Sequence, residues 1–294
     1  MGMKRKRMIG QIILTVLFSV LCIMVIIPFI LVLSVSFSNE NDIIQYGYKM
    51  IPMHIDLASY RYLFKNPESI IRAYEVTILF SVVATFLSVL LMCMLSYTLA
   101  KPKIKGKNIL SFIIYFTMLF NGGLVPTYIL ITQYLHLDDT IWVYIIPGLI
   151  SPWYVFMIRT FFKGIPYDIC ESAMIDGANE YRIFFGMMIP LSKPVIATVA
   201  LFMFLGKWND WMTAMLYIND DRLVSLQYLL QRIMNNIKIL QENADASNYM
   251  STEQIPSETV RMAMAIVVAG PALVVFPFFQ KYFVKGLTVG SVKG

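Results

Sequence analysis

The stretch Val76–Ala100, VTILFSVVATFLSVLLMCMLSYTLA, contains no charged side chain. The hydrocarbon core of a bilayer is about 30 Å thick, and a helix needs roughly 20 apolar residues to cross it. This stretch is long enough and apolar enough to do so. It therefore predicts a transmembrane helix, which sets the class of fold.

Five further stretches meet the same requirement of length and composition. They are Ile12–Leu33, Ile109–Leu130, Ile141–Phe162, Pro194–Tyr217 and Met262–Val284. The chain is 58% hydrophobic and 14% charged, whereas a soluble domain carries about 25% charged residues. We therefore predict an all-α integral membrane protein with six transmembrane helices. A cleaved signal peptide is the alternative for the first stretch, but its apolar core exceeds the roughly 7–15 residues of such peptides.

The basic residues indicate the direction in which the helices cross the membrane. If the N-terminus lies inside the cell, fifteen Lys and Arg fall in cytosolic segments and eight in the longer external ones. The densest clusters are Lys4–Arg7 and Lys101–Lys107. Cytosolic loops of membrane proteins carry the excess of Lys and Arg. We therefore predict that both termini are cytosolic.

Composition also excludes several classes of function. The net charge of +6 does not indicate nucleic-acid binding, because the basic residues lie beside apolar stretches and no recognition module occurs. Cys22, Cys93 and Cys170 have neither metal-ligand spacing nor a plausible disulfide partner. The only two histidines, His54 and His136, lie far apart, so a histidine-based metal site or triad has almost nothing to build from. We expect no catalytic residue and no metal site.

The connection between the fourth and fifth stretches differs from the other cytosolic segments because it is acidic. It holds all four cytosolic acids: Asp168, Glu171, Asp176 and Glu180. The pattern predicts two short helices, Tyr167–Asp176 after Pro166 and Glu180–Ile189 ended by Pro190. Gly177 lies between them, where a sharp turn favours a residue without a side chain.

The first of these short helices has one apolar face. That face consists of Ile169, Cys170, Ala173 and Met174. The inner leaflet of the membrane is anionic and attracts basic segments, so an acidic helix is poorly suited to lie on it. Docking into a groove of another protein explains this helix better than contact with lipid does.

The stretch Glu171–Pro190, ESAMIDGANEYRIFFGMMIP, resembles the EAA loop of ABC importer permeases. The family pattern is E-A-A, three residues, G, nine residues, and I-x-L-P. Four positions match it outright: Glu171, Ala173, Gly177 and Pro190. Three positions depart from it by small changes: Ser172 for Ala, Met187 for Ile and Ile189 for Leu. The spacing is intact, so the resemblance is specific.

Other segments resemble carbohydrate importers, in particular the second permease of the maltose-like class and its oligosaccharide and polysaccharide branch. They are Asn121–Tyr128 (NGGLVPTY), Arg159–Phe162 (RTFF), Trp208–Trp211 (WNDW) and Gly290–Gly294 (GSVKG). The resemblance implies a type I ABC importer permease fold in a bacterial cell membrane. It also implies a second, homologous permease as partner, an ATPase dimer, and an extracellular or periplasmic sugar-binding protein.

The resemblance divides the chain into two parts. Residues 1–70 would form the basic N-terminal segment, the first transmembrane helix and an external loop. Residues 71–290 would form the importer transmembrane domain in contact with membrane lipid, with its coupling loop at 163–193. The residues expected to couple this loop to the ATPase are Glu171, Ala173, Met174, Asp176, Gly177, Ala178 and Pro190.

The chain has no phosphate-binding loop of the G-x-x-x-x-G-K-[ST] type, so ATP and Mg are expected on the partner ATPase. ATPase closure would then push the two short helices and lever the fourth and fifth spans. The alternative is an ion-gradient-coupled secondary transporter built on Lys207 and Asp210, which lie three residues apart and could pair. An intramembrane hydrolase would need a buried Asp pair, a Ser–His pair or zinc ligands, and none is visible.

Candidate sugar contacts combine aromatic faces with polar side chains. Trp208, Asn209 and Trp211 offer both in the outer half of the fifth span, and Asn121 and Tyr128 flank a Gly-Gly…Pro interruption of the third. Broken helices often line substrate cavities. Interfacial anchoring and a packing kink are the alternatives.

The last long connection, Asn219–Val260, is polar and is predicted to be external. Loops of this length usually have a function. By resemblance it should touch the sugar-binding protein, and a plain connector is the alternative.

Overall fold

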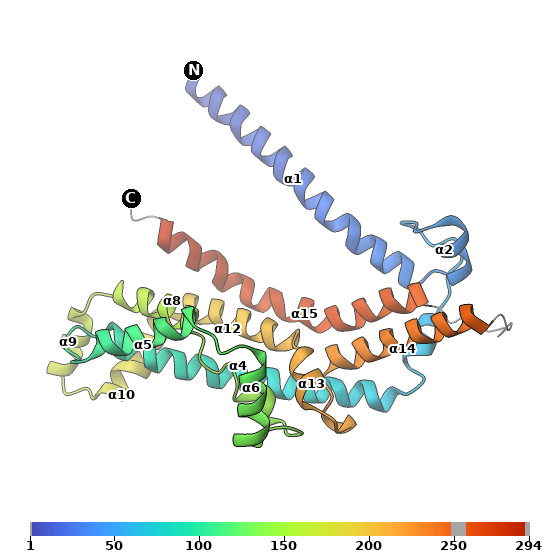
Figure 1. Ribbon diagram of the computed structural model, residues 1–294. Helices are drawn as coiled ribbons and strands as arrows, with labels where there is room; N and C mark the ends of the chain where they lie inside the picture. Colours follow the sequence, from blue (N-terminus) through green and yellow to red (C-terminus); the bar gives the residue numbers. More distant parts are fainter. Residues whose placement is uncertain (1, 248–256, 292–294) are drawn as a thin grey trace. The chain divides into compact units, whose positions relative to one another are not determined.

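The computed structural model describes residues 2–247 and 257–291, and the side chains of residues 8–239 and 257–277. Its elements are helices, apart from one isolated bridge between Ser38 and Ile55 among the described residues (Figure 1). The chain forms two compact units. One comprises Met1–Pro67 and Leu230–Gly270, and the other comprises Glu68–Leu229 and Pro271–Gly294.

The first unit begins with α1 (Gly2–Ser36), which exposes apolar side chains over most of the stretch from Met8 to Leu33. An apolar helix without a protein partner on its surface fits a lipid environment. It is followed by α2 (Glu40–Tyr46) and α3 (Ala58–Leu63). Parts of α14 (Leu226–Ser247) and α15 (Ser257–Ser291) complete the unit.

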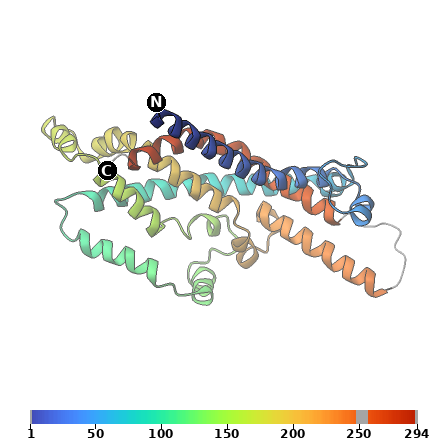
Figure 2. The same ribbon diagram turned by 90° about the horizontal axis from the view of Figure 1, so that it is seen from above.

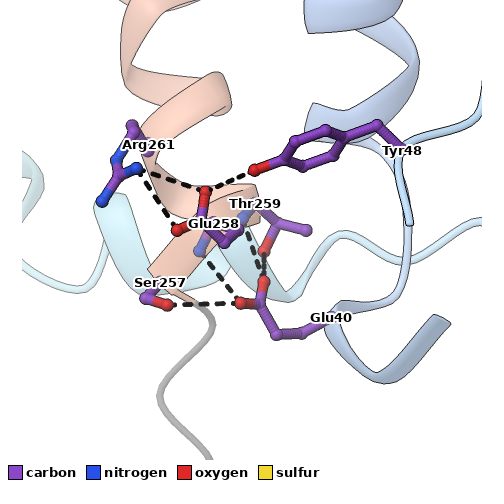
Figure 3. Close-up of polar contacts among 6 residues, drawn as sticks. All are labelled: Glu40, Tyr48, Ser257, Glu258, Thr259 and Arg261. Atoms are coloured by element: carbon purple, nitrogen blue, oxygen red, sulfur yellow. Dashed lines mark hydrogen bonds and ion pairs between the residues drawn. The ribbon is translucent and has the colours of Figure 1, made fainter. Parts of the chain in front are cut away.

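Glu40 joins α2 to the beginning of α15 (Figure 3). Its carboxylate accepts hydrogen bonds from the backbone N–H groups of Glu258 and Thr259, both at 2.9 Å, and from Thr259 Oγ1 at 2.8 Å. Ser257 Oγ donates to the same carboxylate at 3.3 Å. The first N–H groups of a helix lack partners within the helix. Glu40 therefore caps α15 from a distant part of the chain.

The second unit contains the remaining helices. They are α4 (Pro67–Ala100), α5 (Lys107–Leu119), α6 (Leu124–Ile129), η1 (Leu130–Tyr134), α7 (Trp142–Ile145), α8 (Pro152–Lys163), α9 (Asp168–Ile175), α10 (Glu180–Ile183), η2 (Phe184–Met188), α11 (Ile189–Leu191), α12 (Lys193–Trp208), α13 (Met212–Tyr217) and η3 (Asp221–Leu223). Helices α4 and α12 lie side by side in both views (Figure 2). Met92 and Cys93 of α4 share one buried cluster with Val195 and Val199 of α12.

The described residues contain three helices that are long and apolar enough to cross a membrane: Met8–Ser36, Pro67–Ala100 and Ser257–Pro277. Two bent pairs of helices raise the number to five if each pair is one span. They are Lys107–Leu119 with Leu124–Tyr134, bent by 113°, and Glu180–Leu191 with Lys193–Trp208, bent by 81°. The fold is helical and membrane-spanning as predicted, and the exact count of six spans stays a prediction.

The predicted fourth span, Ile141–Phe162, is not one continuous helix. Its chain breaks between α7 and α8, where Gly148 has a φ of +78°. Pro147 and Pro152 lack the N–H group that an uninterrupted helix needs, and Pro152 occupies the first turn of α8 instead. Local proline and glycine chemistry therefore prevails over the apolar pattern here.

The connection Asn219–Val260 is also more ordered than the expected loop. Its described part contains the amphipathic helix α14, and residues 248–256 lie outside the described residues.

Candidate functional site

The two short helices predicted between the fourth and fifth spans are present. The first, α9, begins with Asp168 and carries Glu171 in its first turn, where acidic groups stabilise a helix N-terminus. Cys170 and Ala173 are buried in the cluster that contains Tyr97. The acidic helix is thus anchored on the transmembrane core by its apolar face.

The second short helix does not stop at Pro190 as expected. It starts at Glu180, widens to a π-helical turn at Phe184–Met188 and continues through Pro190 to Leu191. The N–H of Ile189 reaches back five residues to the carbonyl of Phe184. Pro190 then falls in the first turn of α11, where its missing N–H costs little.

Gly177 forms the turn between the two helices. Its φ is +80°, in the left-handed region that favours glycine. The N–H of Gly177 donates to the carbonyl of Met174 at 3.0 Å, and the N–H of Ala178 donates to the carbonyl of Ala173 at 2.9 Å. These two bonds define a Schellman motif, the common glycine-dependent end of a helix. This turn has the geometry that the predicted role of Gly177, reversing the chain between two helices, requires.

The tip of the loop exposes apolar side chains. Ile175 is 86% exposed and Tyr181 71%, and Met174 is partly exposed beside them. Large apolar groups grouped on an exposed turn are typical of a protein interaction surface. Of the predicted docking face, Met174 is exposed here, whereas Cys170 and Ala173 are buried within this chain. Ile175 and Tyr181 lie outside the predicted face.

Two basic residues after α4 hold the loop by its acids. Lys103 Nζ lies 3.1 Å from Glu171 Oε1, and Lys101 forms an ion pair with Glu180. The hydroxyl of Tyr97 also donates to Glu180 at 2.8 Å. The Lys101 ammonium and then the Tyr97 hydroxyl lower the pKa of Glu180, against the opposing effect of desolvation. Both acids are therefore engaged within this chain.

A second candidate site is a pocket of about 460 Å³ among the broken helices. Its wall includes Asn121 and Thr127 from the third predicted span, Pro147 from the fourth, and Asp210 and Thr213 from the fifth. Three helix breaks thus meet at one cavity, and irregular backbone lining a cavity is where transporters commonly bind substrates.

Asn121 and Thr127 fix the break in the third span. Asn121 Oδ1 accepts a hydrogen bond from the N–H of Gly123 at 2.9 Å, and Thr127 Oγ1 donates to the carbonyl of Gly123 at 2.7 Å. Tyr128 stacks on Tyr217, which lines the pocket, with ring centroids 5.5 Å apart. Asn121 and Tyr128 therefore lie at or beside the same cavity.

The candidates of the fifth span are more scattered. Trp208 is 1% exposed, and its ring packs near Phe204 at 5.8 Å. The side chain of Asn209 bonds to the carbonyl of Leu205 and to Gln227. Trp211 is 37% exposed. None of Trp208, Asn209 and Trp211 lines the pocket, so their role as sugar contacts stays a prediction.

Lys207 and Asp210 do not form an ion pair within 4.0 Å in the described part of the chain. The Lys207 ammonium donates instead to the carbonyls of Tyr144 at 2.6 Å and Pro147 at 3.1 Å. Asp210 accepts from the N–H and hydroxyl of Thr213 at 3.0 and 2.7 Å. The break in the fourth span exposes carbonyls that need a donor, and Lys207 supplies it.

Among the described residues, no group of three or more His, Cys, Asp or Glu side chains could hold a metal ion. The expectation of no metal site rests on the sequence and is not tested further by this observation.

A family model described as "Binding-protein-dependent transport system inner membrane component" matches residues 92–289, more than half of the chain. The chain belongs to this family. The matched segment includes every residue predicted to couple to an ATPase and every candidate of the substrate path. The family is that of the membrane components of ABC importers, so the type I permease fold expected from the loop is confirmed.

Relatives of this membrane component include proteins named for carbohydrate transport systems. The protein LplC of Bacillus subtilis is 38% identical over 270 residues, covering 92% of this chain and 90% of LplC. The polygalacturonan/rhamnogalacturonan transport system permease protein YtcP of the same organism is 37% identical, covering 95% of each chain. A crystal structure of a bacterial ABC transporter that imports the acidic polysaccharide alginate matches with a TM-score of 0.79 and 28% identity, over 94% of this chain and 96% of that chain.

Sequence reasoning missed the basic residues that secure the loop in this membrane component. Lys101 and Lys103 were interpreted only as orientation signals, and Tyr97 only as part of a span. No sequence spacing predicts that Lys101 pairs with Glu180 or Lys103 with Glu171, because about 70 to 80 positions separate the two partners of each pair. No local signal identifies such partners.

Proposed function

We propose that this permease forms half of the translocation pathway of an ATP-driven, binding-protein-dependent importer of a sugar or oligosaccharide. The observation that carries the proposal is the exposed turn around Gly177. It presents Ile175 and Tyr181 to a partner while Cys170 and Ala173 fix its other face to the transmembrane core. A helix pair built in this way can be displaced by a partner protein and transmit that displacement to the transmembrane helices.

The partners follow from the family. A membrane component of this type works with a second permease, an ATPase and a binding protein. We place the turn around Gly177 on the ATPase, and the external parts of α14 and its connection on the binding protein. The excess of Lys and Arg supports cytosolic N- and C-termini in the bacterial cell membrane.

The energy source is ATP with Mg, bound by the ATPase subunit. The alternative of an ion gradient acting on Lys207 and Asp210 gains no support, because Lys207 is bonded to two backbone carbonyls and Asp210 to Thr213. A proton relay needs charged groups that can exchange partners within the membrane. These two residues instead stabilise helix ends.

The substrate would pass beside the pocket at the three helix breaks. Asn121 and Asp210 supply polar groups there, and the stacked pair Tyr128 and Tyr217 supplies an aromatic face. The names of the relatives support an oligosaccharide derived from a polysaccharide as the class of substrate. The second permease would complete the pathway.

The energy source is tested with the assembled complex in proteoliposomes. Uptake of sugar should require ATP inside the vesicles and should not change when a proton gradient is imposed. Uptake by this chain alone, driven by a gradient, would contradict the proposal.

The coupling role of the loop is tested at Gly177. Gly177→Asp should leave the protein inserted and paired with its fellow permease, while ATPase recovery and sugar uptake both fall sharply. The left-handed backbone strains a residue with a side chain by about 1–2 kcal/mol, and an added acid changes the face offered to the ATPase. Within the described part of the chain, no heavy atom beyond the two neighbouring residues lies within 4 Å of the position that a Cβ would take, so no clash should prevent the permease from folding.

The matched control is Gly177→Asn, because Asn has nearly the size of Asp, also occurs at positive φ, and carries no charge. It should retain more ATPase and more uptake than Gly177→Asp. Full ATPase recovery and normal uptake with Gly177→Asp would show that this loop is not the coupling element.

A further inference from the structure

The coupling loop is attached to α4 as well as to the helices that flank it in sequence. The attachment consists of Tyr97, Lys101 and Glu180, which we call the α4 junction. Tyr97 and Lys101 lie at the C-terminal end of α4, and Glu180 is the first residue of α10. We propose that the α4 junction passes the movement of the coupling loop into α4, so that Tyr97, Lys101 and Glu180 are positioning residues of the transport cycle. The inference rests on the proposed function.

The geometry of the α4 junction closes a triangle of three interactions. Lys101 pairs with Glu180, Tyr97 donates its hydroxyl to Glu180 at 2.8 Å, and the Lys101 ammonium lies 4.5 Å from the centre of the Tyr97 ring. Only 15% of the Lys101 side chain is exposed. Charge-assisted hydrogen bonds and a cation over an aromatic ring reinforce one another when water is partly excluded.

Both ends of the α4 junction are mechanically fixed. The Tyr97 ring is 8% exposed and packs near Phe184, with centroids 5.3 Å apart, and edge-on to Phe162 at 6.4 Å. On the other side, Asn179 caps α10 by accepting a hydrogen bond from the N–H of Arg182 at 2.9 Å. A displacement of α10 is therefore transmitted to the end of α4 rather than absorbed by a loose side chain.

The helix that receives this displacement is long. Helix α4 runs without interruption from Pro67 to Ala100. In its N-terminal half, Thr77 Oγ1 accepts a hydrogen bond from the N–H of Leu226 at 2.9 Å, and Phe80 stacks with centroids 4.3 Å apart on Tyr144, the chain neighbour of the pocket-lining Val143. Tyr144 belongs to α7, whose broken end forms part of the pocket wall. A continuous helix links the coupling loop to the substrate pocket region in a way that the broken fourth span cannot.

The competing explanation is a static ion pair with no part in transport. Pairs that are open to solvent contribute little to stability, and more than half of the Glu180 side chain is exposed. The two explanations differ in one measurable quantity, the amount of sugar taken up per ATP hydrolysed. If the pair is static, breaking it by substitution should leave this ratio unchanged. If the α4 junction transmits movement, breaking it should lower the ratio.

The test uses the full complex of both permeases, ATPase and binding protein in proteoliposomes. Glu180→Gln and Lys101→Met should each lower uptake per ATP by about five- to tenfold, the size of a typical coupling between two sites. Co-purification of the ATPase and its rate of hydrolysis should stay within about twofold of the original protein, since the exposed tip at Ile175 is unchanged. The double exchange Lys101→Glu with Glu180→Lys should restore at least half of the ratio.

Lys105→Met is the matched control, because Lys105 is an exposed lysine of the same segment outside the α4 junction. It should leave uptake per ATP unchanged. Loss of the ATPase together with uptake in Glu180→Gln would assign Glu180 to the docking surface and overturn the inference. An unchanged ratio in both single variants, or no recovery in the double exchange, would overturn it as well. Failure of the unsubstituted complex to show ATP-dependent uptake would instead refute the proposed function.

Discussion

Glu40 and Glu180 both join segments that are far apart in the sequence, but they do so in opposite environments. Glu40 is 9% exposed and accepts hydrogen bonds from backbone N–H groups and hydroxyls at the start of α15 (Figure 3). The Glu180 side chain is 56% exposed and is held by the side chains of Lys101 and Tyr97. The first carboxylate satisfies a helix end, and the second links α10 to the end of α4.

The difference teaches what each joint can contribute. Removing a buried acceptor leaves backbone donors without partners, which lowers the stability of the fold. Removing an exposed ion pair costs little stability, because water replaces either partner. We therefore expect Glu40 to govern stability and Glu180 to govern coupling.

The largest expected effect is that of Glu40→Ala. The substitution removes the acceptor of four hydrogen bonds at the N-terminus of α15. It should lower the free energy of unfolding by about 2–4 kcal/mol, measured by thermal unfolding in detergent micelles.

The control for this variant is Asp42→Ala on the same helix. Asp42 bonds to His54, whose side chain is 76% exposed, so a shift of well under half the size is expected. Equal shifts for Glu40→Ala and Asp42→Ala would contradict the proposed difference between buried and exposed joints.

A smaller effect is expected for Lys207→Met, which tests whether a half-buried cation plays the same part in the second unit. The methionine keeps the length of the side chain but leaves the carbonyls of Tyr144 and Pro147 without their donor. The loss should be about 1–3 kcal/mol in the same assay. Lys193→Met, at the exposed start of α12, is the control, and a stability equal to that control would show that water replaces the ammonium.

The sequence predicted the parts of this molecule that depend on composition and short spacing. Apolar length predicted the transmembrane class, and Pro166, Gly177 and Pro190 predicted a helix pair with a glycine turn. These signals are local, so they can be recognised without knowledge of the fold. The break in the fourth span was also readable locally, since Pro147 and Gly148 stand together within it, but the apolar pattern was given more weight.

The contacts of Glu40 and Glu180 could not be predicted, because their partners lie far away in the sequence. Glu40 meets Thr259 across 219 positions, and Glu180 meets Tyr97 across 83. Their partners are backbone donors or a common aromatic residue, which any sequence contains in many places. Lys207 was paired with Asp210 because they lie three residues apart on a helix. Lys207 instead bonds to the carbonyls exposed by the break at Pro147, which is distant in the sequence.

The smallest expected effect on stability is that of Glu180→Gln, and it completes the comparison. Because solvent screens the pair with Lys101, the substitution should change the free energy of unfolding by only about 0.5 kcal/mol at neutral pH. The charged and titratable groups that face Glu180 are Lys101, Tyr97 and Cys170. The pKa of Glu180 is lowered from its usual value by the Lys101 ammonium.

The sign of the pH dependence follows from this lowered pKa. A carboxyl whose pKa falls on folding stabilises the folded protein above its unfolded pKa, and that contribution disappears as the pH falls through the folded pKa. The original protein should therefore exceed Glu180→Gln slightly in Tm at pH 7, and the two should converge as the pH falls below about 4. High salt should reduce the difference at pH 7 as well. A drop in Tm as large as that of Glu40→Ala would show that Glu180 serves stability, and it would remove the distinction between the two joints.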